Sequence, residues 1–237
     1  MTIKLLILSL VTVFATGAHA SVISATVGGI GDSFSVDFNG SVDGTPQAGL
    51  TSTAAFTVTD VTYDAGTGNT EWDFTVALAN TSSSPITGSR VSGLAFDTNP
   101  NALIPQSSVS EGGFTNVVGG GSLPTLGGSF EICLTSGPSC QGGGGIGPSI
   151  GDTANLMLTL AFAGNTTSLM MDNFAVRYQS IVGSSYGTSG VGTAVPLPPA
   201  IWLFLSALMG LFAARRLRTQ SRNDTATNAT TPSLQPA

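Results

Sequence analysis

The stretch TEWDFTVALA, residues 70–79, alternates apolar and polar side chains along its length. Its large apolar members are Trp72, Phe74, Val76 and Leu78. In an extended chain, side chains at every second position lie on one face, so these four would face a core and the residues between them would face water. The stretch therefore predicts a half-buried β-strand.

Six further segments show the same period of two: residues 33–38, 53–63, 90–96, 129–134, 155–162 and 173–181. Segments rich in Gly, Asn, Asp, Ser, Thr and Pro separate them: residues 39–45, 64–69, 80–85 and 112–128. Short strands with such punctuation are typical of all-β proteins. We expect an antiparallel β-sandwich that is jelly-roll-like.

Residues 1–20 have the form of a secretory signal peptide. Lys4 precedes an apolar core over residues 5–15, and the small-residue site Ala18-His19-Ala20 ends the segment. A first membrane helix is disfavoured because the core is short. We expect cleavage after Ala20, export of residues 21–182 as one β domain, and a Gly/Ser-rich linker over residues 183–194.

Between Ser21 and Val195 the chain has twelve acidic and two basic residues, a net charge of −10, with no Lys and no His. A basic surface for nucleic acid is therefore not expected. Without His or Lys, a Ser nucleophile lacks an activating base, and His-ligated metal chemistry is excluded. We expect no catalytic residues, no cofactor and no metal site in the mature chain.

The two cysteines lie close together in CLTSGPSC, residues 133–140. In an exported protein the pair Cys133 and Cys140 predicts a disulfide, whereas Zn would need further Cys or His ligands. The closed ring contributes at most about 2.5 kcal/mol by the chain-entropy estimate. The glycines at 142–145 lack the Lys-Ser/Thr of a phosphate-binding loop and predict a solvent-exposed loop.

A proline box, an apolar segment and a basic cluster follow one another in AVPLPPAIWLFLSALMGLFAARRLR, residues 194–218. The prolines prevent a helix through the box, so a helix is expected over residues 200–214. Residues 197–214 carry no charge, and a helix of that length measures about 27 Å, just enough to span a bilayer. The arginines after it favour a cytoplasmic C-terminal end, and a polar disordered tail is expected over residues 219–237.

This order resembles the PEP-CTERM sorting signal in its Val-Pro-Leu-Pro-Ala variant. The residues that carry the resemblance are Val195, Pro196, Leu197, Pro198, Ala200, Trp202, Leu203, Phe204, Gly210, Arg215 and Arg216. A second proline at 199 and the long tail depart from the pattern. The resemblance implies export through the inner membrane of a Gram-negative bacterium, a transient single-pass anchor there, and processing by an exosortase near Val195–Pro198. An ordinary permanent anchor is the alternative.

Residues 86–101, 133–145 and 171–181 resemble the cistern family of PEP-CTERM proteins, which has a similar Cys pair, Gly run and VRYQS-like segment. That resemblance implies a surface or matrix protein and brings no known enzymatic residues with it. Arg90 and Arg177, the two bases of the domain, lie within these segments. We expect them to pair with carboxylates such as Asp97 or Asp172 as structural fasteners rather than to bind a ligand.

The leading hypothesis is thus a non-catalytic surface or extracellular-matrix protein that an exosortase processes and that associates with exopolysaccharide. The alternative is a carbohydrate- or Ca²⁺-binding module anchored by the C-terminal helix. Sugar stacking would need exposed aromatic rings, for which the candidates are Tyr63, Phe114 and Tyr186, and Asp152 and Asp172 are candidate Ca²⁺ ligands. An exported hydrolase ranks last, with three glutamates as its candidates: Glu71, Glu111 and Glu131.

Overall fold

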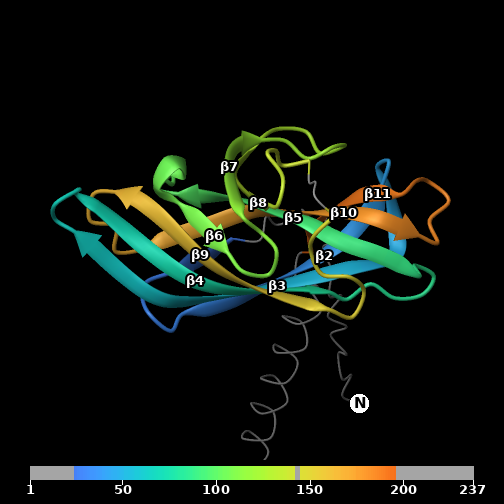
Figure 1. Cartoon of the computed structure of the whole chain (residues 1–237), viewed down its shortest axis with the longest axis horizontal. Coiled ribbons are helices and arrows are strands. Elements are labelled where there is room, and N and C mark those ends of the chain that lie inside the picture. The colour runs from blue at the N-terminus through green and yellow to red at the C-terminus, as the bar shows by residue number, and fades with distance from the viewer. Residues whose placement is uncertain (1–23, 142–144, 196–237) are drawn as a thin grey trace, which may run out of the picture. The chain divides into compact units, whose positions relative to one another are not determined.

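The computed structural model describes residues 24–141 and 145–195, which form β-strands and one short 3-10 turn (Figure 1). The strands are β1 (Ala25–Val27), β2 (Ser33–Val42), β3 (Thr45–Asp64), β4 (Asn69–Asn80), β5 (Gly88–Asn99), β6 (Ser108–Ser110), β7 (Asn116–Gly121), β8 (Phe130–Thr135), β9 (Thr153–Ala163), β10 (Leu169–Val182) and β11 (Ser189–Ala194), and the turn is η1 (Ile104–Gln106). The prediction of an all-β fold is confirmed: six of the seven predicted strands lie within β2, β3, β4, β5, β9 or β10, and the seventh, residues 129–134, begins one residue before β8.

All the strands join one antiparallel sheet, in the order β6-β9-β4-β3-β2-β11-β10-β5-β8-β7, with β1 added to β10. The two ends of this path, β6 and β7, come back into contact without pairing in the described part of the chain (Figure 1). The sheet is therefore nearly closed on itself. Its halves enclose the core between them, as in a flattened barrel or sandwich.

Four phenylalanines join the two halves across the interior. Phe56 of β3 stacks on Phe34 of β2 at 4.8 Å between ring centroids, and it contacts Phe96 of β5 at 5.8 Å and Phe174 of β10 at 5.7 Å. The alternating residues of β4, from Trp72 to Leu78, are buried on the same side, as predicted. The period-two pattern thus supplies the inner face of the sheet.

The expectation of a linker over residues 183–194 was wrong, because Ser189–Ala194 form β11 in the middle of the sheet, between β10 and β2. The glycines that suggested flexibility here allow close packing instead. A Cβ on Gly192 would lie 2.7 Å from Cγ2 of Val176, and one on Gly190 would lie 2.3 Å from the carbonyl oxygen of Ser41. Only a residue without a side chain fits these positions.

The turn-rich segment 112–128 likewise contains a strand, β7, that composition did not indicate. A Cβ on Gly121 at its end would lie 2.5 Å from Sγ of Cys140, so this glycine allows the backbone to approach the disulfide. In the same segment Phe114 is 1% exposed and belongs to the core. Its expected role as an exposed ring was therefore wrong.

A second apolar cluster lies on the opposite face of β5, β8 and β10 from the main core. We call it the outer cluster; it consists of Ala95, Leu123, Phe130, Cys133, Cys140, Ala175 and Val191. It explains why β8 and the centre of β10 are buried on both faces, whereas most of β4 alternates. Leu123, in the connection between β7 and β8, covers this part of the sheet from outside.

Candidate functional site

The two arginines do not pair with carboxylates, contrary to expectation: neither Arg90 nor Arg177 has an ion-pair partner in the described ranges. Arg90 is half-buried, and its Nε is buried without a hydrogen-bond partner there. Arg177, on β10, is only 8% exposed. Asp97, one of the carboxylates expected to be a partner, accepts instead from the N–H of Glu131 and the amide of Asn173, and Asp172, the other, lies opposite Asp97 on the neighbouring strand.

Backbone carbonyl groups hold the Arg177 guanidinium. Its Nη1 donates to the carbonyl oxygen of Gly190 on β11 at 3.0 Å, and its Nε donates to that of Gln141, next to the disulfide, at 3.3 Å. Burial lowers the pKa of Arg177 from its ordinary value, because removal from water disfavours the charged form. Arg177 is therefore a buried cation that is hydrogen-bonded but has no ion-pair partner within residues 24–141 and 145–195.

A cavity of about 230 Å³ lies beside Arg177. Two hairpins and the β7–β8 connection supply its remaining lining: Val42, Asp43, Pro124, Thr125, Tyr186, Gly187, Thr188, Ser189 and Gly190. We call it the Arg177 cavity. It combines one cation, one carboxylate, several hydroxyl groups and an aromatic ring.

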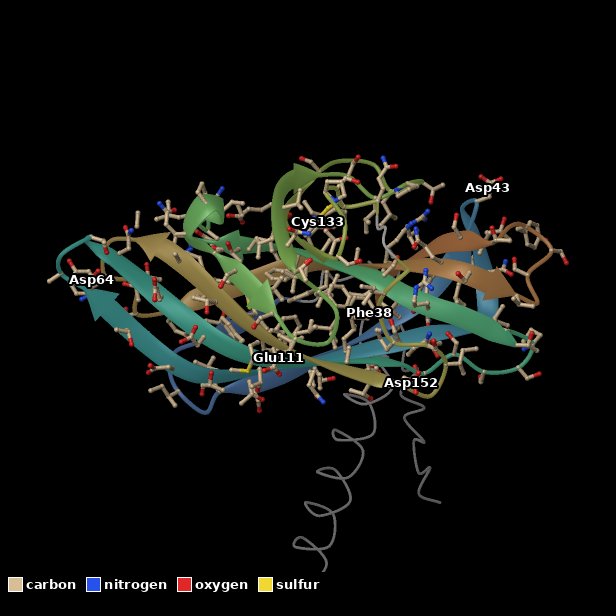
Figure 2. The ribbon with its side chains drawn as sticks, viewed as in Figure 1. Phe38, Asp43, Asp64, Glu111, Cys133 and Asp152 are labelled. Atoms are coloured by element: carbon tan, nitrogen blue, oxygen red, sulfur yellow. A yellow bond between two sulfur atoms is a disulfide. The ribbon has the colours of Figure 1, made fainter. Side chains whose placement is uncertain are left out.

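The rim of the Arg177 cavity comes from the turns at the ends of paired strands. Asp43 and Gly44 connect β2 to β3 and both have positive φ, 50° and 74°, as a two-residue turn of type I′ requires. Figure 2 shows Asp43 at one end of the sheet and Asp64, at the other end of β3, on the opposite side. Tyr186, in the β10–β11 hairpin, is 57% exposed, so its ring is available to a ligand.

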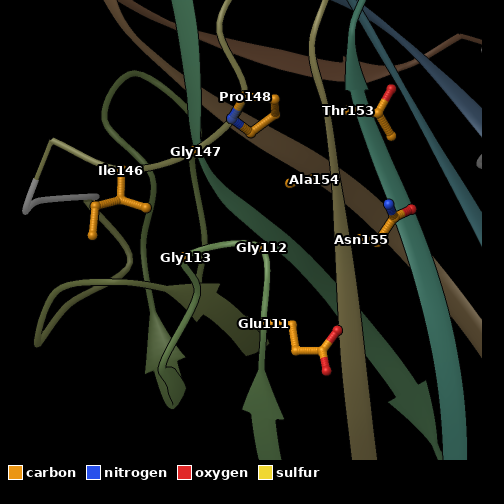
Figure 3. Close-up of a pocket in the computed structure, with 9 residues that line it drawn as sticks. All are labelled: Glu111, Gly112, Gly113, Ile146, Gly147, Pro148, Thr153, Ala154 and Asn155. Atoms are coloured by element: carbon orange, nitrogen blue, oxygen red, sulfur yellow. The ribbon is translucent and has the colours of Figure 1, made fainter.

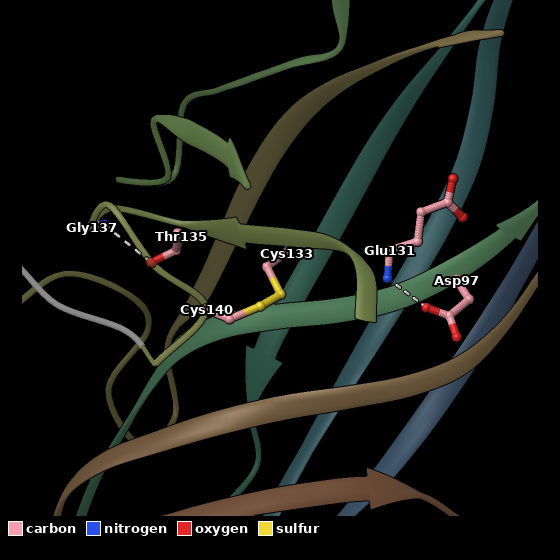
Figure 4. The surroundings of a disulfide bond; sticks show 6 residues. All are labelled: Asp97, Glu131, Cys133, Thr135, Gly137 and Cys140. Atoms are coloured by element: carbon pink, nitrogen blue, oxygen red, sulfur yellow. Dashed lines mark hydrogen bonds between the residues drawn. A yellow bond between two sulfur atoms is a disulfide. The ribbon is translucent and has the colours of Figure 1, made fainter. Parts of the chain in front are cut away.

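The predicted disulfide between Cys133 and Cys140 is confirmed, with the two Cα atoms 5.4 Å apart, within the usual range (Figure 4). Both cysteines are 2% exposed and belong to the outer cluster. Inside the closed ring, the N–H of Gly137 donates to the Thr135 hydroxyl at 3.1 Å. Because Gln141 follows Cys140, the disulfide also fixes one of the two carbonyl groups that hold Arg177.

Three carboxylates lie on the neighbouring strands β5, β8 and β10: Asp97, Glu131 and Asp172. Asp97 accepts from the N–H of Glu131 at 2.7 Å (Figure 4), and Glu131 accepts from both the N–H and the hydroxyl of Thr98. Asp172 lies opposite Asp97 across the β10–β5 pair. Burial, and the negative charge of Asp97, raise the pKa of Asp172. Asp97 and Glu131 thus accept backbone N–H groups and tie β5 to β8.

Glu111 lines a separate groove of about 570 Å³ with Thr153 and Asn155 of β9 (Figure 3). Ile146 and Gly113 stand on its other side, and no aromatic residue is among the described residues that line it. Glu71 is exposed on β4. The three candidate glutamates of a hydrolase therefore occupy three different settings, and none of these settings pairs two of them.

The candidate Ca²⁺ ligands lie in different surroundings. Asp172 is next to Asp97, whereas Asp152 lies in the turn before β9, where its backbone bonds Ser149 and Asn80. Within residues 24–141 and 145–195, no group of three or more His, Cys, Asp or Glu side chains is placed to hold a metal ion.

Of the expected sorting residues, Val195 lies at the end of the described chain, where its N–H donates to the carbonyl oxygen of Asp37 at 2.8 Å. The others lie outside the described residues: Ala20, Pro196, Leu197, Pro198, Arg215 and Arg216. So do the signal peptide and the helix expected over 200–214. In the part of the chain that the structure describes, no helix has the length and apolar character needed to cross a bilayer.

The residues that sequence reasoning missed are those brought together by the hairpins. Asp43 lies in the predicted turn segment 39–45, of which only Asp43 and Gly44 lie outside the strands, and this Asp-Gly pair is a hairpin signal. Tyr186 was named as an exposed ring, which is confirmed, as it is for Tyr63 at 48% exposure. Asp43 and Tyr186 lie beside Arg177 because residues 189–194 form β11. The Gly-rich composition of that segment did not indicate a strand.

Comparison with protein-family models, curated proteins and solved structures found no match to this chain. Its function is therefore argued from its own residues and their arrangement.

Proposed function

We propose that the protein is an exported surface or extracellular-matrix protein without catalytic activity. In this proposal an exosortase sorts it and cuts its C-terminal signal, after which it associates with exopolysaccharide. The inner membrane holds the chain only until it is processed.

The observation that carries this proposal is the place where the folded domain ends. The last strand, β11, ends at Ala194, and the hydrogen bond from Val195 to Asp37 is the last one in the described chain. The described residues end at Val195, directly before Pro196, the first proline of the box. A cut within the box would therefore leave every described strand intact and release a complete β domain.

The disulfide supports export. Such bonds form and persist in oxidising compartments outside the cytoplasm. Here the bond also fixes Gln141, whose carbonyl group accepts from Arg177. Folding of this region thus fits a protein that matures after crossing the inner membrane.

We further infer that the sheet is jelly-roll-like. β4 pairs with β9, and the next strand, β5, pairs with β8, so the two pairs are nested. Nested antiparallel pairs of this kind arise when one long hairpin rolls up into two facing layers. The fold itself does not specify a function, which must come from its sites.

Mass spectrometry of the protein isolated from the surface of its host tests the sorting proposal. We expect a mature N-terminus at Ser21 and a C-terminus between Val195 and Pro199. A variant with Pro196→Ala and Pro198→Ala should keep its tail and remain with the inner membrane, because the extended box is lost.

Pro232→Ala, which changes a proline of the tail outside the box, is the matched control and should be processed like the wild type. A surface-located form that still yields a peptide containing Leu234 would contradict processing. Equal processing of the box variant and the wild type would show that the box is not the recognised element.

A further inference from the structure

The Arg177 cavity contains a buried cation that forms no ion pair within the described residues. Arg177 is 8% exposed, and among the described residues two carbonyl oxygens accept hydrogen bonds from its guanidinium. Burial of a cation without a negative partner is costly, so a site of this kind gains when an anion enters it. The guanidinium is also the group best suited to a planar carboxylate, which it binds through two parallel N–H donors. Its Nη2 is not used in either of these bonds.

The other lining groups narrow the class of anion. Asp43 lines the same cavity and would repel a doubly charged phosphate, but its carboxylate accepts well from a hydroxyl group. The hydroxyl groups of Thr125, Thr188 and Ser189 are further polar partners. A ligand with one carboxylate and several hydroxyl groups would pair with the guanidinium, the Asp43 carboxylate and the hydroxyl groups of the lining. A uronic acid has this combination of groups.

Size and rim fit the same ligand. A volume of about 230 Å³ is below that of pockets for drug-sized molecules, which begin at roughly 300 Å³. It suits a single small ring. The exposed ring of Tyr186 offers an apolar face and a polar hydroxyl group. Such rings can pack against one face of a ligand whose other face contacts water.

We propose that the Arg177 cavity binds a uronate residue of an acidic polysaccharide, with its carboxylate on Arg177, a hydroxyl group on Asp43 and its ring against Tyr186. This inference names a ligand for the proposed association with exopolysaccharide. The identity of the polymer rests on that proposed function, whereas the binding site is argued from the cavity itself. The net charge of −10 between Ser21 and Val195 opposes a polyanion at long range. At physiological ionic strength, charges more than about 8 Å apart are largely screened, so the contact itself decides binding.

Titration of the mature protein from its host with glucuronate, followed by calorimetry and by NMR, tests the site. Glucose and acetate are the matched probes, since the first lacks the carboxylate and the second lacks the ring. We expect glucuronate to bind at least about tenfold more tightly than either, because each probe leaves one set of polar groups unpaired.

Arg177→Gln is expected to weaken glucuronate binding about tenfold or more, through loss of a charged hydrogen bond. Tyr186→Ala should weaken it by about two- to tenfold and should fold normally, because its ring is exposed. Tyr63→Ala, the matched control at the other end of β3, should bind like the wild type. Arg177→Gln also loses the bonds that join Arg177 to Gly190 and Gln141, which can impair folding. If Arg177→Gln fails to fold, Tyr186→Ala still tests the site.

Unchanged affinity in Tyr186→Ala, equal binding of glucose, or equal binding of acetate would each overturn the proposal. Oligogalacturonate and neutral dextran then test the polymer. Binding of glucuronate without retention of the oligomer would support the site and contradict the matrix association. Retention of both polymers alike, with no binding of glucuronate, would overturn the site and leave a less specific association with polysaccharide.

Discussion

Removal of the Cys133–Cys140 disulfide is expected to lower the free energy of unfolding by about 2.5 kcal/mol. The two cysteines are seven positions apart, and closing so short a ring in the unfolded chain removes entropy worth about that much at 25 °C. Both side chains are 2% exposed, so their alanine replacements remain in the outer cluster. Since small domains are stable by about 5–15 kcal/mol, the loss is a large fraction.

The assay is urea unfolding followed by tryptophan fluorescence, since Trp72 is fully buried and is the one tryptophan in residues 24–195. The wild type is unfolded and refolded with and without dithiothreitol, because the buried bond must be opened in the unfolded state. The double variant Cys133→Ala/Cys140→Ala is the control and should not respond to the reductant. For a domain of this size the melting temperature should fall by about 5–10 °C.

A difference of less than about 0.5 kcal/mol between reduced and oxidised wild type would refute this prediction, since the ring would then constrain the unfolded chain little. Equal destabilisation of the double variant by dithiothreitol would refute it as well. A loss well above about 2.5 kcal/mol would mean that the bond supports the surrounding loops as well, including the carbonyl group of Gln141 that holds Arg177.

Three further predictions concern the sheet. Phe56→Ala should lower the free energy of unfolding by about 3–5 kcal/mol, because Phe56 joins both halves; a loss below about 1 kcal/mol in urea would contradict that role. Tyr178→Phe removes the 2.7 Å bond to Ser52 and should cost about 1 kcal/mol. Burial raises the pKa of Tyr178, so wild-type stability should fall as pH rises above about 10, and the variant should lose that slope in pH-dependent melting. The raised pKa of Asp172 disfavours its charged form, so Asp172→Asn should melt higher at pH 7 and lose this advantage near pH 3.

The sequence predicted the strands whose residues alternate strictly, because a buried inner face requires that period. Trp72 to Leu78 and Leu156 to Phe162 are examples, and both segments are core strands. β1 and β6 have only three residues each, too few to establish a period. They form because neighbouring strands, β10 and β9, offer them hydrogen-bonding edges.

Glycine-rich strands could not be predicted, because glycine signals a turn unless the packing is known. Gly192 is required because a Cβ there would lie 2.7 Å from Cγ2 of Val176, and Gly121 is required because a Cβ there would contact the disulfide. Both contacts are with residues that are distant in the sequence.

The burial of Asn80 could not be predicted from the sequence either. It begins a glycosylation triplet, yet it is 1% exposed and its amide bonds Ser89 and Pro148.

The Arg177 cavity escaped prediction for the same reason. Charge counting identified Arg177 as unusual in an acidic domain, and it suggested a carboxylate partner as the simplest neutralisation. The partners are instead carbonyl groups of Gly190 and Gln141, which any residue type can supply. No side-chain pattern encodes such partners, so an arginine that lacks a counter-charge can be identified only in the folded chain.

The position of β11 limits where the proposed C-terminal sorting signal could be removed without loss of a strand. β11 pairs with β10 on one side and with β2 on the other, and Val191 is fully buried in the outer cluster. A cut before Ser189 would remove a central strand and leave two rows of backbone groups unpaired, whereas a cut after Val195 removes no described strand. Residues 189–194 are therefore held within the sheet, whereas prolines such as those of the box cannot donate to a β-ladder. Under the proposed sorting, cleavage in the box is therefore the position of cutting that leaves the described sheet intact.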